Sequence, residues 1–183
     1  MDKAAAARAI DAFLLALGRD PAKEPELRGT GARVAEAFAD ELCRGYAVDV
    51  DALLRENTLD VATSGVVFLR DIAVSTTCPH HLMLGTGLAT VAYAPRGKIL
   101  GVGAIARVVD AFSQRLALQE TIGEEVAAAL EAHLAPSWVL CRIVMSHGCM
   151  TARGERRHGA TLETLALRGD TKAALAAAGT VRG

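Results

Sequence analysis

The sequence predicts an α+β protein with a largely antiparallel sheet, and three observations lead to this class. Apolar residues recur at helical spacing through residues 1–43. Strand-like runs rich in Val, Ile and Leu then follow one another over residues 65–75 and 83–93. Residues 104–134 return to helical spacing before two more strand-like runs. Because helices and strands fall in separate blocks, antiparallel pairing is favoured over a parallel α/β sheet.

The first part of the chain is expected to be helical. Residues 4–17 carry apolar side chains on one helical face, and Gly18 is a natural stop. Residues 20–31 contain two prolines and two glycines and are expected to form a loop. A second amphipathic helix is predicted over residues 32–43, and residues 49–57 are expected to form a short turn or helix.

The rest of the chain alternates between strands and one long helical region. A short third strand is predicted over residues 99–102, after a Pro-Arg-Gly-Lys turn. The helical region 104–134 is expected to kink or form a hairpin near residues 116–118. Two final strands are predicted at residues 138–145 and 161–167. We expect three parts: an N-terminal helical segment (1–60), a catalytic domain (61–170) and an Ala-rich C-terminal tail (171–183).

Composition excludes several classes of function. The net charge of −1 over 183 residues argues against nucleic-acid binding through a basic surface. Aromatic residues make up only 4%, so stacking platforms for single strands are not expected. No apolar run approaches the roughly 20 residues that a membrane helix needs. No secretory segment is visible at the start, which leads us to expect a cytoplasmic protein.

The most informative residues are a group of cysteines and histidines. Cys78 and His81 have the spacing of a compact metal-binding motif, and Cys149 can supply a third ligand from a distant segment. Two thiolates and one imidazole suit Zn²⁺, and three protein ligands leave the fourth position open, as in catalytic zinc sites. His80 and His147 lie beside these ligands and could carry protons in a hydrolytic reaction.

Other interpretations of the four cysteines were weighed. Cys43 and Cys141 lie in apolar surroundings and are expected to be ordinary buried residues. A disulfide between Cys78 and Cys149 is the alternative to a metal site. Because thiols stay reduced in the cytoplasm, paired Cys and His residues there more often bind metal, which favours zinc.

Four distinctive segments occur in order: RDIAVSTTCPHH (residues 70–81), ATVAYAP (89–95), SQRLALQE (113–120) and HGCMTARG (147–154). Through these segments the chain resembles the GTP cyclohydrolase I family. The resemblance covers most of residues 32–154. It implies the tunnelling fold, in which two long helices cover one face of an antiparallel sheet. Subunits of this family assemble side by side into rings, commonly decamers, with active sites between subunits.

The resemblance also implies a reaction and its residues. Zn²⁺ bound by Cys78, His81 and Cys149 would activate a water that attacks C8 of the guanine ring of GTP. His147 matches the residue that protonates the ring nitrogen, and His80 matches a neighbour of the ribose and metal. The products would be 7,8-dihydroneopterin triphosphate and formate.

Substrate binding is implied at five further positions. Gln119 and Glu120 match the pair that holds the purine, and a carboxylate such as Glu120 can accept two hydrogens from the guanine edge. Arg33, Arg107 and Arg153 match arginines that bind the triphosphate, for which guanidinium groups are suited.

The chain departs from the family pattern where phosphate and ribose bind. Gly103 and Ala104 replace the usual Ser-Lys pair, and residues 155–159 replace a Ser/Thr-rich segment. A divergent enzyme acting on another purine or pterin, or stopping at the ring-opened or deformylated product, is therefore an alternative. A non-catalytic purine- or pterin-binding ring with structural zinc is another. The complete Cys-His-Cys set disfavours the related nitrile reductases, which use a Cys nucleophile, and synthases that need three histidines.

Overall fold

The computed structural model describes residues 1–179, which divide into two compact units. The first comprises Met1–Arg44 and the second begins at Gly45. The division expected from the sequence, 1–60, 61–170 and 171–183, stays a prediction, and residues 180–183 of the expected tail lie outside the described part. Among residues 1–179, none of the helices has the length and apolar character needed to cross a membrane.

The first unit is helical, as the periodicity predicts. Helix α1 (Lys3–Ala16) begins at Asp2, whose side chain accepts a hydrogen bond from the Ala5 amide at 2.9 Å. A short η1 turn (Pro25–Leu27) interrupts the predicted loop. Helix α2 (Thr30–Ala37) continues into a π-helical turn η2 (Phe38–Leu42), which together account for the second predicted helix. The 3-10 turn η3 (Arg44–Ala47) follows.

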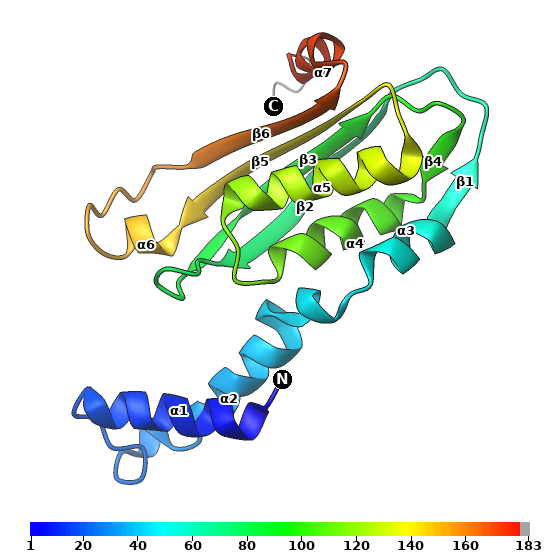
Figure 1. Cartoon of the computed structure of the whole chain (residues 1–183). Coiled ribbons are helices and arrows are strands. Elements are labelled where there is room, and N and C mark those ends of the chain that lie inside the picture. The colour runs from blue at the N-terminus through cyan, green and yellow to red at the C-terminus, as the bar shows by residue number, and fades with distance from the viewer. Residues whose placement is uncertain (180–183) are drawn as a thin grey trace. The chain divides into compact units, whose positions relative to one another are not determined.

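The second unit is built on a four-stranded antiparallel sheet in the order β2-β3-β5-β6 (Figure 1). Each of the four strands confirms a strand expected from the sequence. Two short strands, β1 and β4, form a separate antiparallel pair, so the expected third strand does not join the main sheet. The strands are β1 (Thr58–Asp60), β2 (Val67–Thr77), β3 (Leu84–Tyr93), β4 (Lys98–Leu100), β5 (Trp138–His147) and β6 (Leu162–Gly169).

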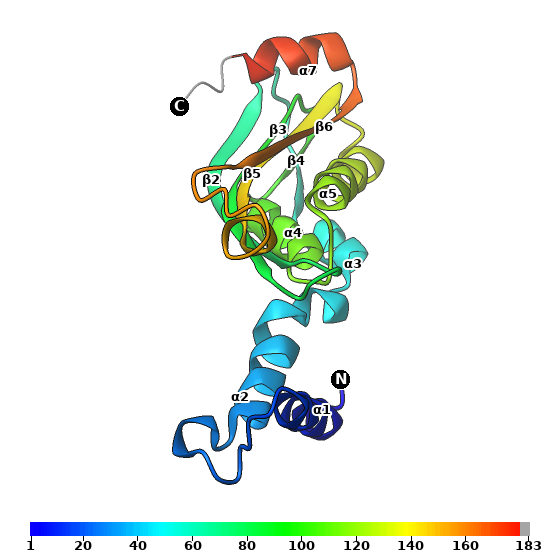
Figure 2. The same ribbon diagram turned by 90° about the vertical axis from the view of Figure 1, so that its left-hand side faces the viewer.

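Helices cover one face of this sheet, which confirms the expected α+β class (Figures 1 and 2). Helix α3 (Val50–Asn57) begins at Asp49, which caps the Ala52 amide at 2.9 Å. Helices α4 (Val102–Ser113) and α5 (Gln119–Leu134) pack against β2, β5 and β6. Two shorter helices follow in the chain, α6 (Gly148–Thr151) after β5 and α7 (Thr171–Ala178) after β6.

Alternation along the strands separates two apolar clusters. Val139, Cys141 and Ile143 of β5 belong to the main core beneath α4 and α5. Trp138 and Leu140 point to the opposite face, where they pack with residues of α7. The main core therefore lies between the sheet and the two long helices.

The predicted kink in the long helical region is a break between α4 and α5. The Ala117 amide donates to the Thr77 carbonyl at 3.2 Å, and the Thr77 amide donates to the Arg115 carbonyl at 3.4 Å. The connection thus pairs with the end of β2 instead of continuing the helix. This pairing places the N-terminus of α5 beside the residues that follow β2.

Candidate active site

The turn between β2 and β3 places the side chains of Cys78 and His81 on the same side of that turn. The Cys78 amide donates to the Met83 carbonyl at 2.9 Å, and the Leu82 amide donates to the Cys78 carbonyl at 2.9 Å. The second bond closes a helix-like turn, in which residues three apart face the same way. Leu82 has a positive φ of 52°, which ends the turn and returns the chain to β3.

Strand pairing brings Cys149 to this turn from a distant part of the sequence. Gly85 at the start of β3 pairs with His147 at the end of β5. Cys149 follows on the single-turn helix α6, whose Thr151 hydroxyl donates to the His147 carbonyl at 3.2 Å. The register of β3 and β5 therefore sets where the third sulfur lies.

The three predicted ligands converge. The Cys78 and Cys149 sulfurs and a His81 ring nitrogen all lie within 4.8 Å of one another, and Cys78 Sγ is 3.9 Å from His81 Nδ1. Tetrahedral Zn²⁺ with usual bond lengths separates its sulfur and nitrogen ligands by about 3.6 Å and two sulfurs by about 3.8 Å. The donor set and its spacing fit zinc after small side-chain adjustments.

Cys43 and Cys141 are buried, as predicted, and neither belongs to the cluster. Burial raises the pKa of the Cys141 thiol to about 12, with Glu124 adding to the effect, so it stays protonated in the core. Burial likewise raises the pKa of Cys43. Burial also raises the pKa of Cys149, where the adjacent Cys78 adds to the effect and the charge of Arg153 opposes it. A divalent cation bound between the two sulfurs would favour their thiolate forms.

A cavity of about 480 Å³ opens beside the cluster, within the usual range for small-molecule sites. It contains two of the three ligands, Cys78 and Cys149, and both of the predicted proton carriers, His80 and His147. Both residues of the predicted purine-binding pair, Gln119 and Glu120, also line it.

Gln119 and Glu120 lie in different environments although they are adjacent. Gln119 is only 1% exposed, whereas Glu120 is exposed in the first turn of α5. Adjacent residues of a helix point about 100° apart, so Gln119 packs against the sheet at the inner side of the cavity while Glu120 is exposed at its opening. A carboxylate in the first turn of a helix is also favoured by the helix dipole. Glu120 is therefore free to accept hydrogen bonds from a ligand.

His147 is held by a hydrogen bond to Gln119. Its Nε2 lies 2.8 Å from Gln119 Oε1, and its ring packs over Gly85. A Cβ added at Gly85 would lie 2.8 Å from His147 Nδ1, so the ring position depends on glycine there. His80 is exposed at the cavity, with its ring edge toward His81 at 6.2 Å between ring centroids.

Two of the three predicted phosphate-binding arginines, Arg107 and Arg153, belong to the second unit but do not line this cavity. Arg107 is exposed on α4 and donates to Asn57 Oδ1 at 2.9 Å. Arg153 is exposed just after α6 and acts on Cys149 through its charge. Arg33 belongs to the first unit, where it donates to the Arg28 carbonyl at 3.0 Å and the Thr30 hydroxyl at 3.1 Å. Their roles stay predictions.

The cavity also has walls that sequence reasoning missed. They are mostly apolar residues with no chemical signature, which come from the α4–α5 connection, from α6 and from the start of β6. Only their nearness to predicted site residues could have suggested them. They are Ala117, Leu118, Met150, Ala160, Thr161 and Leu162.

Comparison with known proteins matches nearly the whole chain. The family model described as GTP cyclohydrolase I matches residues 6–181, beyond the segment 32–154 that carries the sequence motifs. GTP cyclohydrolase 1 of Leifsonia xyli subsp. xyli is 39% identical over 170 residues, covering 92% of this chain and 88% of that protein. GTP cyclohydrolase 1 of Mycolicibacterium vanbaalenii is 39% identical over 173 residues, with 93% and 84% covered. GTP cyclohydrolase 1 of Bartonella quintana is 40% identical over 164 residues, with 88% and 78% covered.

Proposed function

This chain belongs to the GTP cyclohydrolase I family, and on that premise we propose that it hydrolyses GTP to 7,8-dihydroneopterin triphosphate and formate. The observation that carries the proposal is the convergence of Cys78, His81 and Cys149 beside a cavity that also contains His147 and Glu120. This cluster fits the zinc site of the family. When bound, Zn²⁺ supplies the Lewis-acid chemistry of the hydrolysis.

The protein side chains supply recognition and proton transfer. Glu120 accepts hydrogen bonds from N1–H and the exocyclic amine of guanine, which distinguishes guanine from adenine. His147 exchanges a proton with the imidazole part of the purine as the ring opens. His80 lies at the exposed rim of the cavity, where it contacts the ribose. The apolar walls exclude water from the face of the flat base.

The triphosphate is bound by Arg33, Arg107 and Arg153, through bidentate contacts of their guanidinium groups. Arg107 does not line the cavity of its own chain. We propose that Arg107 contacts the phosphates of GTP bound in the cavity of another copy, in a homo-oligomeric ring with sites between subunits. The mass of the native protein, measured by light scattering after gel filtration, tests the assembly; a monomer that is fully active would exclude it.

A divergent reaction is the second candidate, and a specific observation favours it. At the two positions where the family pattern has Ser and Lys, Gly103 faces open space and Ala104 is only 1% exposed in the core. Neither can replace the lost phosphate contacts. A substrate with fewer phosphates, or another purine or pterin, would suit this α4 terminus. So would a reaction that ends at the ring-opened or deformylated product.

The test is to incubate zinc-loaded protein with GTP, GDP, GMP and guanosine, and to measure formate and the fluorescent pterin formed after oxidation. The proposal predicts equal amounts of formate and pterin from GTP. Formate without pterin, or turnover only of a less phosphorylated nucleotide, would support the divergent reaction. Tight purine binding with no product from any substrate would identify a non-catalytic binding protein and contradict both candidates.

A further inference from the structure

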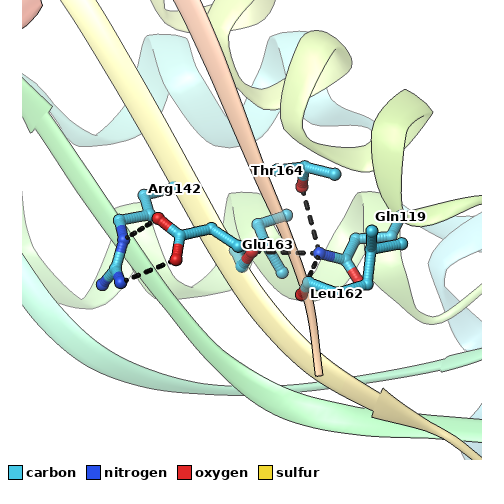
Figure 3. A network of polar contacts seen from close by, with 6 residues as sticks. Gln119, Arg142, Leu162, Glu163 and Thr164 are labelled. Carbon is cyan, nitrogen blue, oxygen red and sulfur yellow. Dashed lines mark hydrogen bonds and ion pairs between the residues drawn. The ribbon is translucent and has the colours of Figure 1, made fainter. Parts of the chain in front are cut away.

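Gln119 is the hub of a buried hydrogen-bond network beneath the cavity (Figure 3). Its Nε2 donates to the Ile143 carbonyl of β5 at 2.9 Å and to the Leu162 carbonyl of β6 at 3.0 Å. The Thr164 hydroxyl lies 3.1 Å from the same nitrogen. Because a carbonyl oxygen can only accept, the two carbonyls require the NH₂ group at this position. The chemistry of the surroundings therefore fixes which end of the amide is nitrogen.

The fixed amide in turn fixes the proton on His147. Gln119 Oε1 can only accept, and it lies 2.8 Å from His147 Nε2. The ring nitrogen must therefore be the donor, so the neutral imidazole carries its proton on Nε2 and a lone pair on Nδ1. Within residues 1–179, no protein group hydrogen-bonds to Nδ1, which lies against Gly85, where an added Cβ would be only 2.8 Å away.

The network also leaves Gln119 little capacity to bind a purine. Both hydrogens of its amide face backbone carbonyls, and its side chain is only 1% exposed. A ligand could accept a hydrogen bond from Gln119 only by replacing bonds that already satisfy these buried groups, which is costly. Oε1 keeps a second lone pair, but it belongs to a side chain that is almost fully buried. The neighbouring Glu120 is exposed to the cavity and has no such commitment.

We propose that Gln119 is a positioning residue, which holds His147 in one ring orientation and one tautomer, and that Glu120 rather than Gln119 supplies the side-chain contact to the guanine edge. The role rests on the proposed function, because it concerns the orientation and tautomer in which His147 meets a substrate. The same amide joins β5 to β6, so the orientation of the histidine is tied to the pairing of the two strands that frame the cavity. This resembles the way orienting groups fix catalytic imidazoles in other enzymes.

The first test is made on the wild-type protein, and a substitution serves only to assign the signal. Solid-state NMR of zinc-loaded protein labelled with ¹⁵N and ¹³C histidine reports which ring nitrogen carries the proton. The five histidines are few enough to resolve, and the His147 signal is the one lost in His147→Asn. In the neutral form of His147 the proton is expected on Nε2. A neutral ring with its proton on Nδ1, or two neutral tautomers in exchange, would overturn the proposal.

The second test separates positioning from substrate binding. Gln119→Leu keeps most of the side-chain volume and removes the acceptor for His147. We expect kcat for GTP to fall about 10- to 100-fold, with KM and zinc content unchanged and with the His147 tautomer no longer unique. A raised KM with unchanged kcat and an unchanged His147 signal would identify Gln119 as a purine contact. If the variant does not fold, the tautomer of His147 in the wild-type spectrum still tests the proposal.

A matched control lies next to the network. Glu163 on β6 forms a bidentate pair with Arg142 on β5 at 2.7 and 3.1 Å (Figure 3), and in the described part of the chain no hydrogen bond joins the Glu163 side chain to Gln119. Glu163→Gln weakens a contact between the same two strands and should leave kcat and the His147 tautomer unchanged. Loss of activity in this control equal to that in Gln119→Leu would refute a specific role for Gln119. A wild-type protein with the expected tautomer but no ring opening would refute the proposed function and leave the orientation of His147 standing.

Discussion

The two ends of helices α4 and α5 differ in how completely their polar groups are organised. At the α4–α5 connection, backbone pairing places Cys78 beside Cys149 and Gln119 beside His147. At the start of α4, Gly103 faces open space and Arg107 is exposed, with Asn57 as its partner. The first end is assembled within one chain, whereas at the second end Arg107 is exposed and Gly103 has no side chain that could contact a substrate. The residues expected to open the ring are therefore held in place by contacts within the fold, whereas the residues expected to bind phosphate are not.

The largest effect is expected from removing a metal ligand. Cys149→Ala leaves two protein ligands, too few to hold zinc tightly, and we expect formate release from GTP to fall more than about 1,000-fold. Zinc content, measured by mass spectrometry of the purified protein, should fall in parallel. The control is Cys141→Ala, which alters a buried thiol and should cost about 1 kcal/mol of stability without loss of zinc. Full zinc content in Cys149→Ala would exclude Cys149 as a ligand.

The next effect separates proton transfer from metal binding at the same end. His147→Ala should lower kcat by about 10²- to 10⁴-fold, the usual contribution of a general acid or base. Zinc should stay bound, because His147 is not one of the three converging ligands. Paired measurements of kcat and zinc content check this. Loss of zinc together with activity would make His147 a ligand and contradict its assigned role.

Substitution of Arg107 tests phosphate binding at the start of α4. If the side chain binds phosphate, Arg107→Ala removes a charge-assisted contact worth about 1.5–3 kcal/mol, which corresponds to a rise of about 10- to 150-fold in KM for GTP. Because the side chain is exposed, the free energy of unfolding should change little. Kinetics with GTP and with guanosine separate the effects, since guanosine has no phosphate to lose. An equal rise in KM for both substrates would mean that Arg107 does not recognise phosphate.

The smallest effect is expected at Gly103. A side chain there meets no atom within 4 Å of its Cβ, so Gly103→Ser is sterically free. Serine has a better helix propensity than glycine, by up to about 0.5 kcal/mol, and thermal unfolding should show a slight gain in stability. A neutral hydrogen bond to substrate would lower KM for GTP by about 2- to 10-fold. A KM that stays the same would show that this end no longer contacts the substrate.

The elements could be predicted from the sequence because each carries a local signal. Helical periodicity marks α1 and the region of α4 and α5, and apolar runs mark the four strands of the main sheet. The pairing of β1 with β4 could not be predicted, since residues 58–60 form only a short strand whose hydrogen-bonding partner lies about 40 residues away. The break before α5 was visible as a kink, but its cause is a contact with Thr77 that depends on tertiary structure.

The candidate site was predictable where residue types are chemically distinctive. Cys78, His81 and Cys149 are recognisable from their side chains and spacing, and the structure brings them together. The direction in which a side chain points cannot be recognised from the sequence in this way. Gln119 and Glu120 are both polar residues in one helical turn, and only the packing of α5 on the sheet shows that one is buried and the other exposed.

The most direct test of the central claim is zinc K-edge X-ray absorption of the purified, reduced protein. We expect one zinc per chain with two sulfur neighbours at about 2.3 Å, and nitrogen or oxygen neighbours at about 2.0–2.1 Å that include one histidine and one solvent ligand. Four sulfur neighbours, or no zinc after purification and reconstitution under reducing conditions, would contradict a site made by Cys78, His81 and Cys149.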